Sequence, residues 1–381
     1  MDKNNIQSVL SLIIVFISLL FTLFLFTVKS TKKLSNILLA LFIFFNAVDI
    51  SSWFLDRHLL PWLDLLMFKH SLGWLINPLF YLYALSICYA DFKLRPKHLL
   101  HLIPFLLANL VLLFEFYTVD HPAKLVFLEH YSEHPEIIFM NIAGHLQFVF
   151  YIAAVFLLLS RYRKIYLENY TDAGSITYRW LFQLTTVITI VHSIVLIKDI
   201  INQVYTTSAF ENAQLIVGIN AMLVVCWFVM KALYNPELFR SVDSAIQPVE
   251  NIIAETVPPV TDEAYATGDT QDERIEQLKS YMVQQEPFLD PALTIQQLAA
   301  GMKMPVRDLS VLINHQLGQH FFDFVNEYRI RKAMALLKDP QKNDLTIQEI
   351  FYEVGFNSKS SFNTAFKKHA GVTPTQFRTA S

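Results

Sequence analysis

The sequence predicts an all-α protein with three parts: an N-terminal bundle of about seven transmembrane helices, a flexible linker, and a C-terminal domain with two helix-turn-helix units. Two observations predict it. Hydrophobic residues make up 54% of the 381 residues and the mean hydropathy is +0.37, above what soluble proteins of this size carry, and the excess lies before Tyr234. One pattern then occurs twice, from Leu293 to Val325 and from Leu345 to Phe377. We therefore expect boundaries at residues 1–234, 235–272 and 273–381.

The N-terminal part contains about seven runs long enough to cross a bilayer, which requires about 20 apolar residues per helix. The first run lacks a small-residue cleavage site and exceeds a signal peptide in apolar length, so we expect it to remain as a helix. The predicted spans are Ile6–Val28, Leu34–Leu55, Ser71–Ala90, Leu99–Tyr117, Ile137–Leu159, Trp180–Gln203 and Ala213–Tyr234.

The orientation of the spans follows from the basic residues in their connections, because cytoplasmic loops are enriched in Lys and Arg. Alternate connections carry far fewer, mainly Arg57 and Lys124, whereas the others carry Lys29, Lys32, Lys33, Lys93, Arg95, Lys97, Arg161, Arg163, Lys164 and Arg179. This bias predicts a multi-pass protein of the cell inner (cytoplasmic) membrane, with its N-terminus outside and everything after Tyr234 in the cytoplasm. An odd number of spans agrees with that orientation.

Ionisable residues inside the spans are candidates for a functional site, because they are costly in hydrocarbon. Asp49, His145 and His192 are possible ligand-sensing residues. There are two competing interpretations: Asp49 lies close enough to a span end to snorkel or meet water, and His145 and His192 bond between helices, as polar residues in membrane bundles do. No pair among these residues in the spans has a metal-ligand spacing such as HxxxH, and the sequence has no HExxH motif. Its two cysteines, Cys88 and Cys226, lie in apolar runs where we expect burial. Neither an enzyme nor a metal or other cofactor is predicted.

Residues 235–272 contain recurrent acids and four prolines but few large apolar residues. Such a segment cannot bury a core, so we expect a flexible tether, with a short helical stalk as the alternative.

Each repeat opens with a capping box, in which a threonine pairs with the residue three positions later: Thr294 with Gln297, and Thr346 with Glu349. In the second repeat we expect Gly355 at the turn and Asn357 or Ser358 as the cap of the next helix. That helix would bury Phe362 and Phe366. Its other face would carry Lys359, Ser360, Asn363, Thr364, Lys367 and Lys368, which are side chains that can read base edges and phosphates in a major groove.

The stretch GFNSKSSFNTAFKKHAGVTPTQFR, together with the helix around Arg329–Leu337, resembles the AraC/XylS transcription regulators. The resemblance covers about Glu273–Arg378 and implies two helix-turn-helix units that bind double-stranded DNA and usually activate transcription, with RNA polymerase as a partner. It implies DNA contacts by Arg307, Ser310 and Val311 in the first unit and by Lys359, Ser360, Asn363, Thr364 and Lys367 in the second.

The first unit departs from the family pattern, so we expect the second to carry most of the specificity. Lys303 replaces the turn glycine, Pro305 a capping serine, and Asn314 and His315 a common basic pair, while Val311 and, in the second unit, Thr364 stand where arginine is frequent. From Arg274 onward the charges are 13 Lys and Arg against 10 Asp and Glu, a net +3. Few phosphates would be neutralised, which predicts modest non-specific affinity for DNA.

These patterns predict a membrane-anchored transcription regulator that couples an unknown membrane or extracytoplasmic signal to gene expression, possibly as a homodimer. The alternative is a membrane receptor or scaffold whose C-terminal head, residues 273–381, binds a protein partner. Substitution of Lys359 and Asn363 would discriminate between the two. A transporter or intramembrane enzyme with a regulatory tail is a third interpretation, supported only by Asn77-Pro78.

Overall fold

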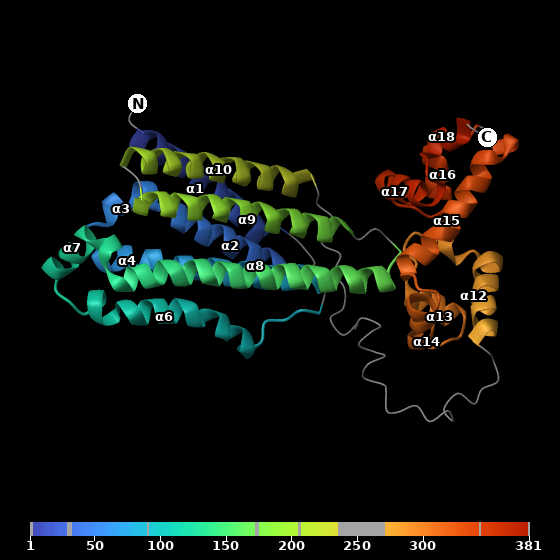
Figure 1. The fold of residues 1–381 in the computed structure, drawn as a ribbon, viewed down its shortest axis with the longest axis horizontal. Helices are drawn as coiled ribbons and strands as arrows, with labels where there is room; N and C mark the ends of the chain where they lie inside the picture. The colour runs from blue at the N-terminus through green and yellow to red at the C-terminus, as the bar shows by residue number, and fades with distance from the viewer. Residues whose placement is uncertain are drawn as a thin grey trace, which may run out of the picture. The chain divides into compact units, whose positions relative to one another are not determined.

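The computed structural model describes residues 3–28, 33–89, 91–171, 175–204, 207–234, 271–342 and 344–379 (Figure 1). These residues form helices and turns without a strand; the only sheet-like pairing among them is an isolated bridge between Tyr170 and Thr294. The chain divides into two compact units. The first comprises Met1–Ser160 and Thr177–Asp243, and the second comprises Arg161–Ile176 and Ser244–Ser381.

Ten α-helices precede residue 235, and seven described segments are long and apolar enough to cross a membrane. The helices are α1 (Lys3–Thr27), α2 (Lys33–Ile50), α3 (Ser52–Leu59), α4 (Leu63–Ser71), α5 (Ile76–Cys88), α6 (Ile103–Leu112), α7 (His121–Glu129), α8 (Pro135–Asn169), α9 (Ser175–Val204) and α10 (Thr207–Tyr234). The prediction of seven apolar spans in an all-α chain is therefore confirmed.

Several boundaries differ from those predicted. The second span ends at Ile50 and is followed by the short helix α3, while the third consists of α4, a single 3-10 turn (Leu72–Leu75) and α5. The acidic connection before α8 contains α7, whose N-terminus is capped by Asp120. Cys88 is buried as expected, but Cys226 is exposed, because it lies on an outward face of α10.

The first unit is held together by contacts typical of membrane bundles. Hydroxyl groups donate to carbonyls of neighbouring helices, Ser11 Oγ to Ile50 O at 2.6 Å and Ser35 Oγ to Ser86 O at 3.1 Å. Large apolar side chains face outward, including Phe150 at 67% exposure and Leu157 at 72%. A surface this apolar suits contact with lipid rather than with water.

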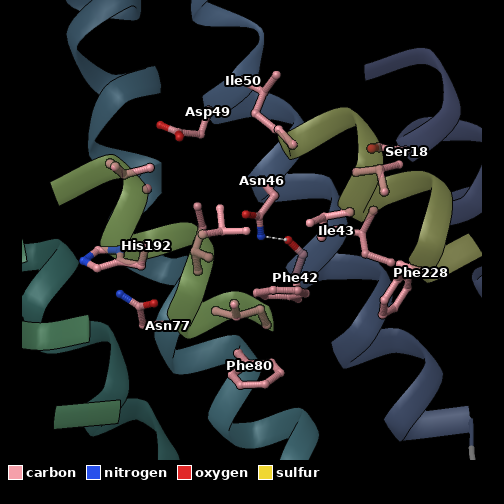
Figure 2. A pocket seen from close by; sticks show the side chains of 18 of the residues that line it. Ser18, Phe42, Ile43, Asn46, Asp49, Ile50, Asn77, Phe80, His192 and Phe228 are labelled. Atoms are coloured by element: carbon pink, nitrogen blue, oxygen red, sulfur yellow. Dashed lines mark hydrogen bonds between the residues drawn. The ribbon is translucent and has the colours of Figure 1, made fainter. Parts of the chain in front are cut away.

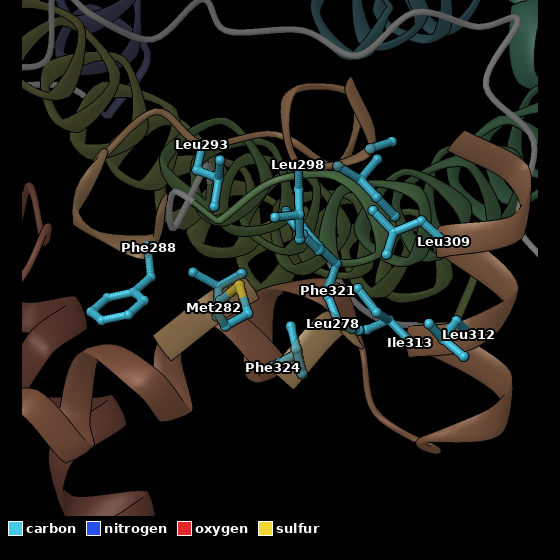
Figure 3. Packing of buried hydrophobic residues seen from close by; sticks show 13 residues of the cluster. Leu278, Met282, Phe288, Leu293, Leu298, Leu309, Leu312, Ile313, Phe321 and Phe324 are labelled. Carbon is cyan, nitrogen blue, oxygen red and sulfur yellow. The ribbon is translucent and has the colours of Figure 1, made fainter. Parts of the chain in front are cut away.

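The second unit contains seven described helices after residue 270: α12 (Gln271–Gln285), α13 (Ile295–Gly301), α14 (Val306–Val311), α15 (Phe321–Lys338), α16 (Ile347–Glu353), α17 (Lys359–Ala370) and α18 (Pro374–Thr379). Their apolar faces form two cores. The first joins α12, α13, α14 and the start of α15 around Leu298, Leu309 and Phe321 (Figure 3). The second joins the rest of α15 with α16, α17 and α18 around Ile350 and Phe362.

The predicted tether, residues 235–272, lies outside the described residues except for Gln271 and Asp272, which begin α12.

Candidate DNA-binding surface and sensing residues

The second helix-turn-helix unit is built by local signals in its sequence. Thr346 caps α16, and Glu349 accepts hydrogen bonds from the Thr346 backbone N–H at 2.7 Å and from its hydroxyl at 2.8 Å. These bonds stabilise the carboxylate, so they lower the pKa of Glu349. Gly355 makes the turn at φ +89°, and Ser358 caps α17 by accepting a hydrogen bond from Ser361 N. The predicted caps and turn are confirmed.

The helix α17 presents a polar face opposite its buried one. Phe362 and Phe366 are fully buried in the second core. Lys359, Ser360, Thr364 and Lys367 are exposed and Asn363 is half-buried, so the five side chains predicted to contact DNA here all reach the surface of one helix. Lys368 donates to Asp323 of α15 at 2.6 Å, which commits part of its charge to an ion pair within the head.

The first helix-turn-helix unit has weaker local signals for its turn and its helix cap than the second. Lys303 adopts the left-handed conformation with φ +53° where glycine would be unstrained, and Pro305 caps α14 without a side-chain hydrogen bond. Arg307 is exposed beside Asp308, and Val311 is half-buried.

Ser310, which is predicted to contact DNA, lies almost buried in the first helix-turn-helix unit. Its side chain is only 5% exposed, and its hydroxyl accepts a hydrogen bond from Asn314 Nδ2 at 3.1 Å. Asn314 Oδ1 in turn accepts from the backbone N–H of Phe321 at the start of α15. The α14 helix passes after six residues into a π-helical turn, Leu312–Gln316, and this arrangement uses Ser310 and Asn314 to hold α15. Both residues serve the fold of the head.

Arg329 of α15 joins the two helix-turn-helix units, and its role was not recognised from the sequence. The side chain is 1% exposed, and it donates to Phe288 O at 2.7 Å and to Asp290 O at 2.8 Å in the first half of the head. Its guanidinium lies over the ring of Phe356 in the second half, 5.5 Å from the ring centroid. A buried arginine with several carbonyl acceptors is a rigid connection, because these acceptors together compensate a charge that would be costly to bury alone.

The same arginine holds the segment that follows α8. Arg329 Nη1 donates to Thr171 O at 3.2 Å, and Nη2 donates to Thr171 Oγ1 at 3.3 Å. Thr171 Oγ1 donates to Leu293 O at 2.8 Å, and Tyr170 forms the bridge with Thr294, the cap of α13. We call this set of contacts the Thr171 clasp. All of it lies within the second unit.

The clasp also borders the second recognition helix. Thr171 and Arg329 line a hollow of about 10 Å³ together with Asn357, Ser358 and Ser361, at the start of α17. One segment after a membrane-length helix therefore touches both helix-turn-helix units.

The three possible sensing residues lie near one another in the first unit. Asp49 and His192 line the same cavity, of about 410 Å³ (Figure 2). His145 is not among the lining residues, but its Nδ1 shares a hydrogen bond with His192 Nε2 at 3.1 Å, and its Nε2 lies 3.6 Å from Asp199 Oδ2. The ring of Phe148 stacks on His192. Within the described residues, no group of three or more metal-ligating side chains is found.

Comparison with known proteins assigns the head. A family model described as a helix-turn-helix domain matches residues 298–380. The chain is 34% identical over 83 residues to the transcriptional activator RhaS of Mannheimia succiniciproducens, covering 22% of this chain and 30% of that protein. It is 30% identical over 92 residues to the melibiose operon regulatory protein of Escherichia coli, covering 24% and 30%.

A solved structure, the C-terminal domain of AraT, a response regulator from Geobacillus stearothermophilus, is 32% identical. The match covers 28% of this chain and 84% of that one, with a TM-score of 0.25. The chain spans less than a third of the two curated relatives named above, and the similarity lies in the head. The C-terminal part of this chain is a helix-turn-helix domain of the AraC/XylS type.

Proposed function

We propose that this protein is a membrane-anchored, sequence-specific DNA-binding transcription activator that couples a membrane or extracytoplasmic signal to gene expression through the position of its two recognition helices. The head supplies DNA binding through the polar face of α17, chiefly Lys359, Ser360, Asn363 and Thr364. Its partners are operator DNA, the lipid bilayer and RNA polymerase, with a second copy of the chain where paired sites favour dimers.

The observation that carries the proposal is the length and ending of α8. Its 35 residues extend about 52 Å at 1.5 Å per residue, whereas a bilayer core is about 30 Å thick. The last residues of α8 and the Thr171 clasp belong to the same compact unit as the head. A shift of the last turns of α8 would therefore act on Arg329 through the Thr171 clasp.

The orientation proposed is the one predicted from the basic loops, with the N-terminus outside and the head in the cytoplasm, at the inner membrane. In that orientation α8 runs from the outer side to the cytoplasm, which brings its C-terminal end to the side where DNA is found.

The test is crosslinking of the full-length protein to the genome of its host, followed by recovery of the bound DNA. We expect discrete enriched sites in the wild type and their loss in the double variant Lys359→Ala/Asn363→Ala. Lys279→Ala is the matched control, because it removes one exposed lysine from α12, away from α17. Equal enrichment in the double variant would contradict DNA reading by α17 and would favour a head that binds a protein partner.

A further inference from the structure

The cavity in the first unit has the size of a ligand-binding site. Its volume of about 410 Å³ falls within the range of about 300–1,000 Å³ that small-molecule pockets occupy. Side chains from α1, α2, α3, α5, α8, α9 and α10 line it, so a bound molecule would contact most of the bundle at once.

Asp49 and the aromatic side chains of the lining lie at different levels of the cavity. Figure 2 shows Asp49 near the top, Asn46 and His192 below it, and Phe42, Phe228 and Phe80 lower down, with Asn77 at about the height of Phe42 and Phe228. An occupant that matches this lining has a polar group at one end and an apolar body. In the proposed orientation Asp49 lies toward the outer side of the membrane, because it is in the last turn of α2, which runs from the cytoplasm to the outer side.

Asp49 has an exposed side chain, and within the described residues its carboxylate takes part in no hydrogen bond or ion pair. The cations that act on it electrostatically are engaged elsewhere: Lys69 with Asp56 at 2.7 Å, His70 with Asp56 at 2.9 Å, and Lys198 with Asp199 at 2.8 Å. A carboxylate at a cavity in a membrane bundle is costly without a partner. The carboxylate of Asp49 therefore has no cation of the protein paired with it among the described residues, and a positively charged ligand could fill that place.

Neighbouring groups complete a site for an ammonium head. Asn46 uses its Nδ2 to donate to Phe42 O of its own helix, at 2.7 Å, which leaves its Oδ1 as an acceptor. Trp53, one turn after Asp49, also lines the cavity, and aromatic rings attract positive charge. The negative charge of Asp49 would repel a ligand that carries a carboxylate.

From this arrangement we propose that the cavity binds a small amphipathic amine, with its ammonium group on Asp49 and its apolar body among Phe42, Phe80 and Phe228. The inference deepens the proposed function, on which it rests for the amine's role as the signal. Binding would also reach α8 through His192, which shares its hydrogen bond with His145 and stacks on Phe148, two residues of that helix.

The test is calorimetric titration of the purified full-length protein in lipid nanodiscs with three probes of equal chain length: decylamine, decanol and decanoate. We expect decylamine to bind at least about tenfold more tightly than decanol, the ratio that one charge-assisted contact supplies. Asp49→Asn should abolish that preference while leaving decanol binding unchanged. Ala221→Phe, which fills part of the cavity, should weaken decylamine and decanol alike. Empty nanodiscs give the partitioning of each probe into lipid.

Asp120→Asn is the matched control, because it neutralises an exposed carboxylate far along the chain and asparagine also caps helices. Equal affinity of the wild type for all three probes would overturn the proposal, as would an amine preference that persists in Asp49→Asn. The assay does not involve DNA. Amine binding that leaves operator binding unchanged would keep this site and refute the proposed signalling function instead.

Discussion

The Thr171 clasp gives the sharpest test of coupling, through the substitution Thr171→Val. Valine keeps the branched shape of threonine but lacks its hydroxyl, so the substitution removes hydrogen bonds without opening a space. Two contacts are lost: the bond that Oγ1 donates to Leu293 O and the bond that it accepts from Arg329 Nη2.

The cost can be worked out from what remains. Arg329 Nη2 still donates to Asp290 O at 2.8 Å, and Nη1 still donates to Thr171 O, so the buried charge keeps acceptors. Leu293 O still accepts from the backbone N–H of Thr171, at 3.4 Å. Because no charge is left unsatisfied, we expect the contact between the Tyr170–Thr171 segment and the rest of the head to lose about 1–2 kcal/mol of free energy. That loss raises the open population of the clasp about 5–30-fold.

Hydrogen exchange of the full-length protein in nanodiscs measures this population, because amides exchange through local opening. Peptides covering Asn169–Thr171 and Leu293–Leu298 should exchange about 5–30-fold faster in Thr171→Val. Peptides of α1 and α2 should be unaffected, since they belong to the first unit.

The control is Thr118→Val, which removes an exposed hydroxyl that bonds only to Phe114 O of its own turn. If Thr171→Val exchanged no faster than Thr118→Val, the hydroxyl would not hold the clasp and the proposed route from α8 to the head would be wrong.

Three further predictions concern the head and the topology. Gly355→Ala should destabilise the head by about 1–3 kcal/mol or more, because φ is +89° and the new Cβ would lie 2.6 Å from Phe288 O. Its melting temperature should fall by about 4–8 °C per kcal/mol. Gly371→Ala, also at positive φ but with no neighbour within 4 Å, should cost less, and equal losses would refute the steric argument. The capping-box carboxylate Glu349 has a lowered pKa, so its stabilising effect is present above its ordinary pKa of 4.5 and is lost as the pH falls through the lower folded value; chemical denaturation between pH 6 and about 3 should show a steeper loss in the wild type than in Glu349→Gln. In a cysteine-free background, His130→Cys should react with a membrane-impermeant maleimide in intact cells and Lys279→Cys only after lysis, whereas the reverse would invert the proposed orientation.

The sequence predicts well whatever depends on local periodicity. Apolar run length located all seven spans, and the Thr-x-x-Gln and Thr-x-x-Glu boxes located the starts of α13 and α16. These features need no knowledge of distant contacts, because each is determined within about one or two helical turns.

Features that depend on long-range contacts were missed. Arg329 looks in the sequence like one basic residue among several on a linker helix, yet it is buried by residues 39 to 158 positions away. The DNA contact of Ser310 stays a prediction from the resemblance, but its burial beside a π-helical turn was not predicted from any residue pattern. The length of α8 was underestimated, because its polar last turns do not look like a membrane span.

Three residues in and before α15 bear on how the head would respond to a signal. Ser310 and Asn314 hold the start of α15, while Arg329 near its middle holds both halves of the head and the Thr171 clasp. Since α15 sets the separation of the two recognition helices, the clasp acts at the point where a small displacement changes their spacing on DNA. Recognition helices must enter major grooves about one helical turn, about 34 Å, apart, so a change in spacing alters affinity without altering any base contact. The signal would then change the spacing of the recognition helices and so the affinity for DNA. Lys359 and Asn363 would set which operator sequence is bound, with or without the signal.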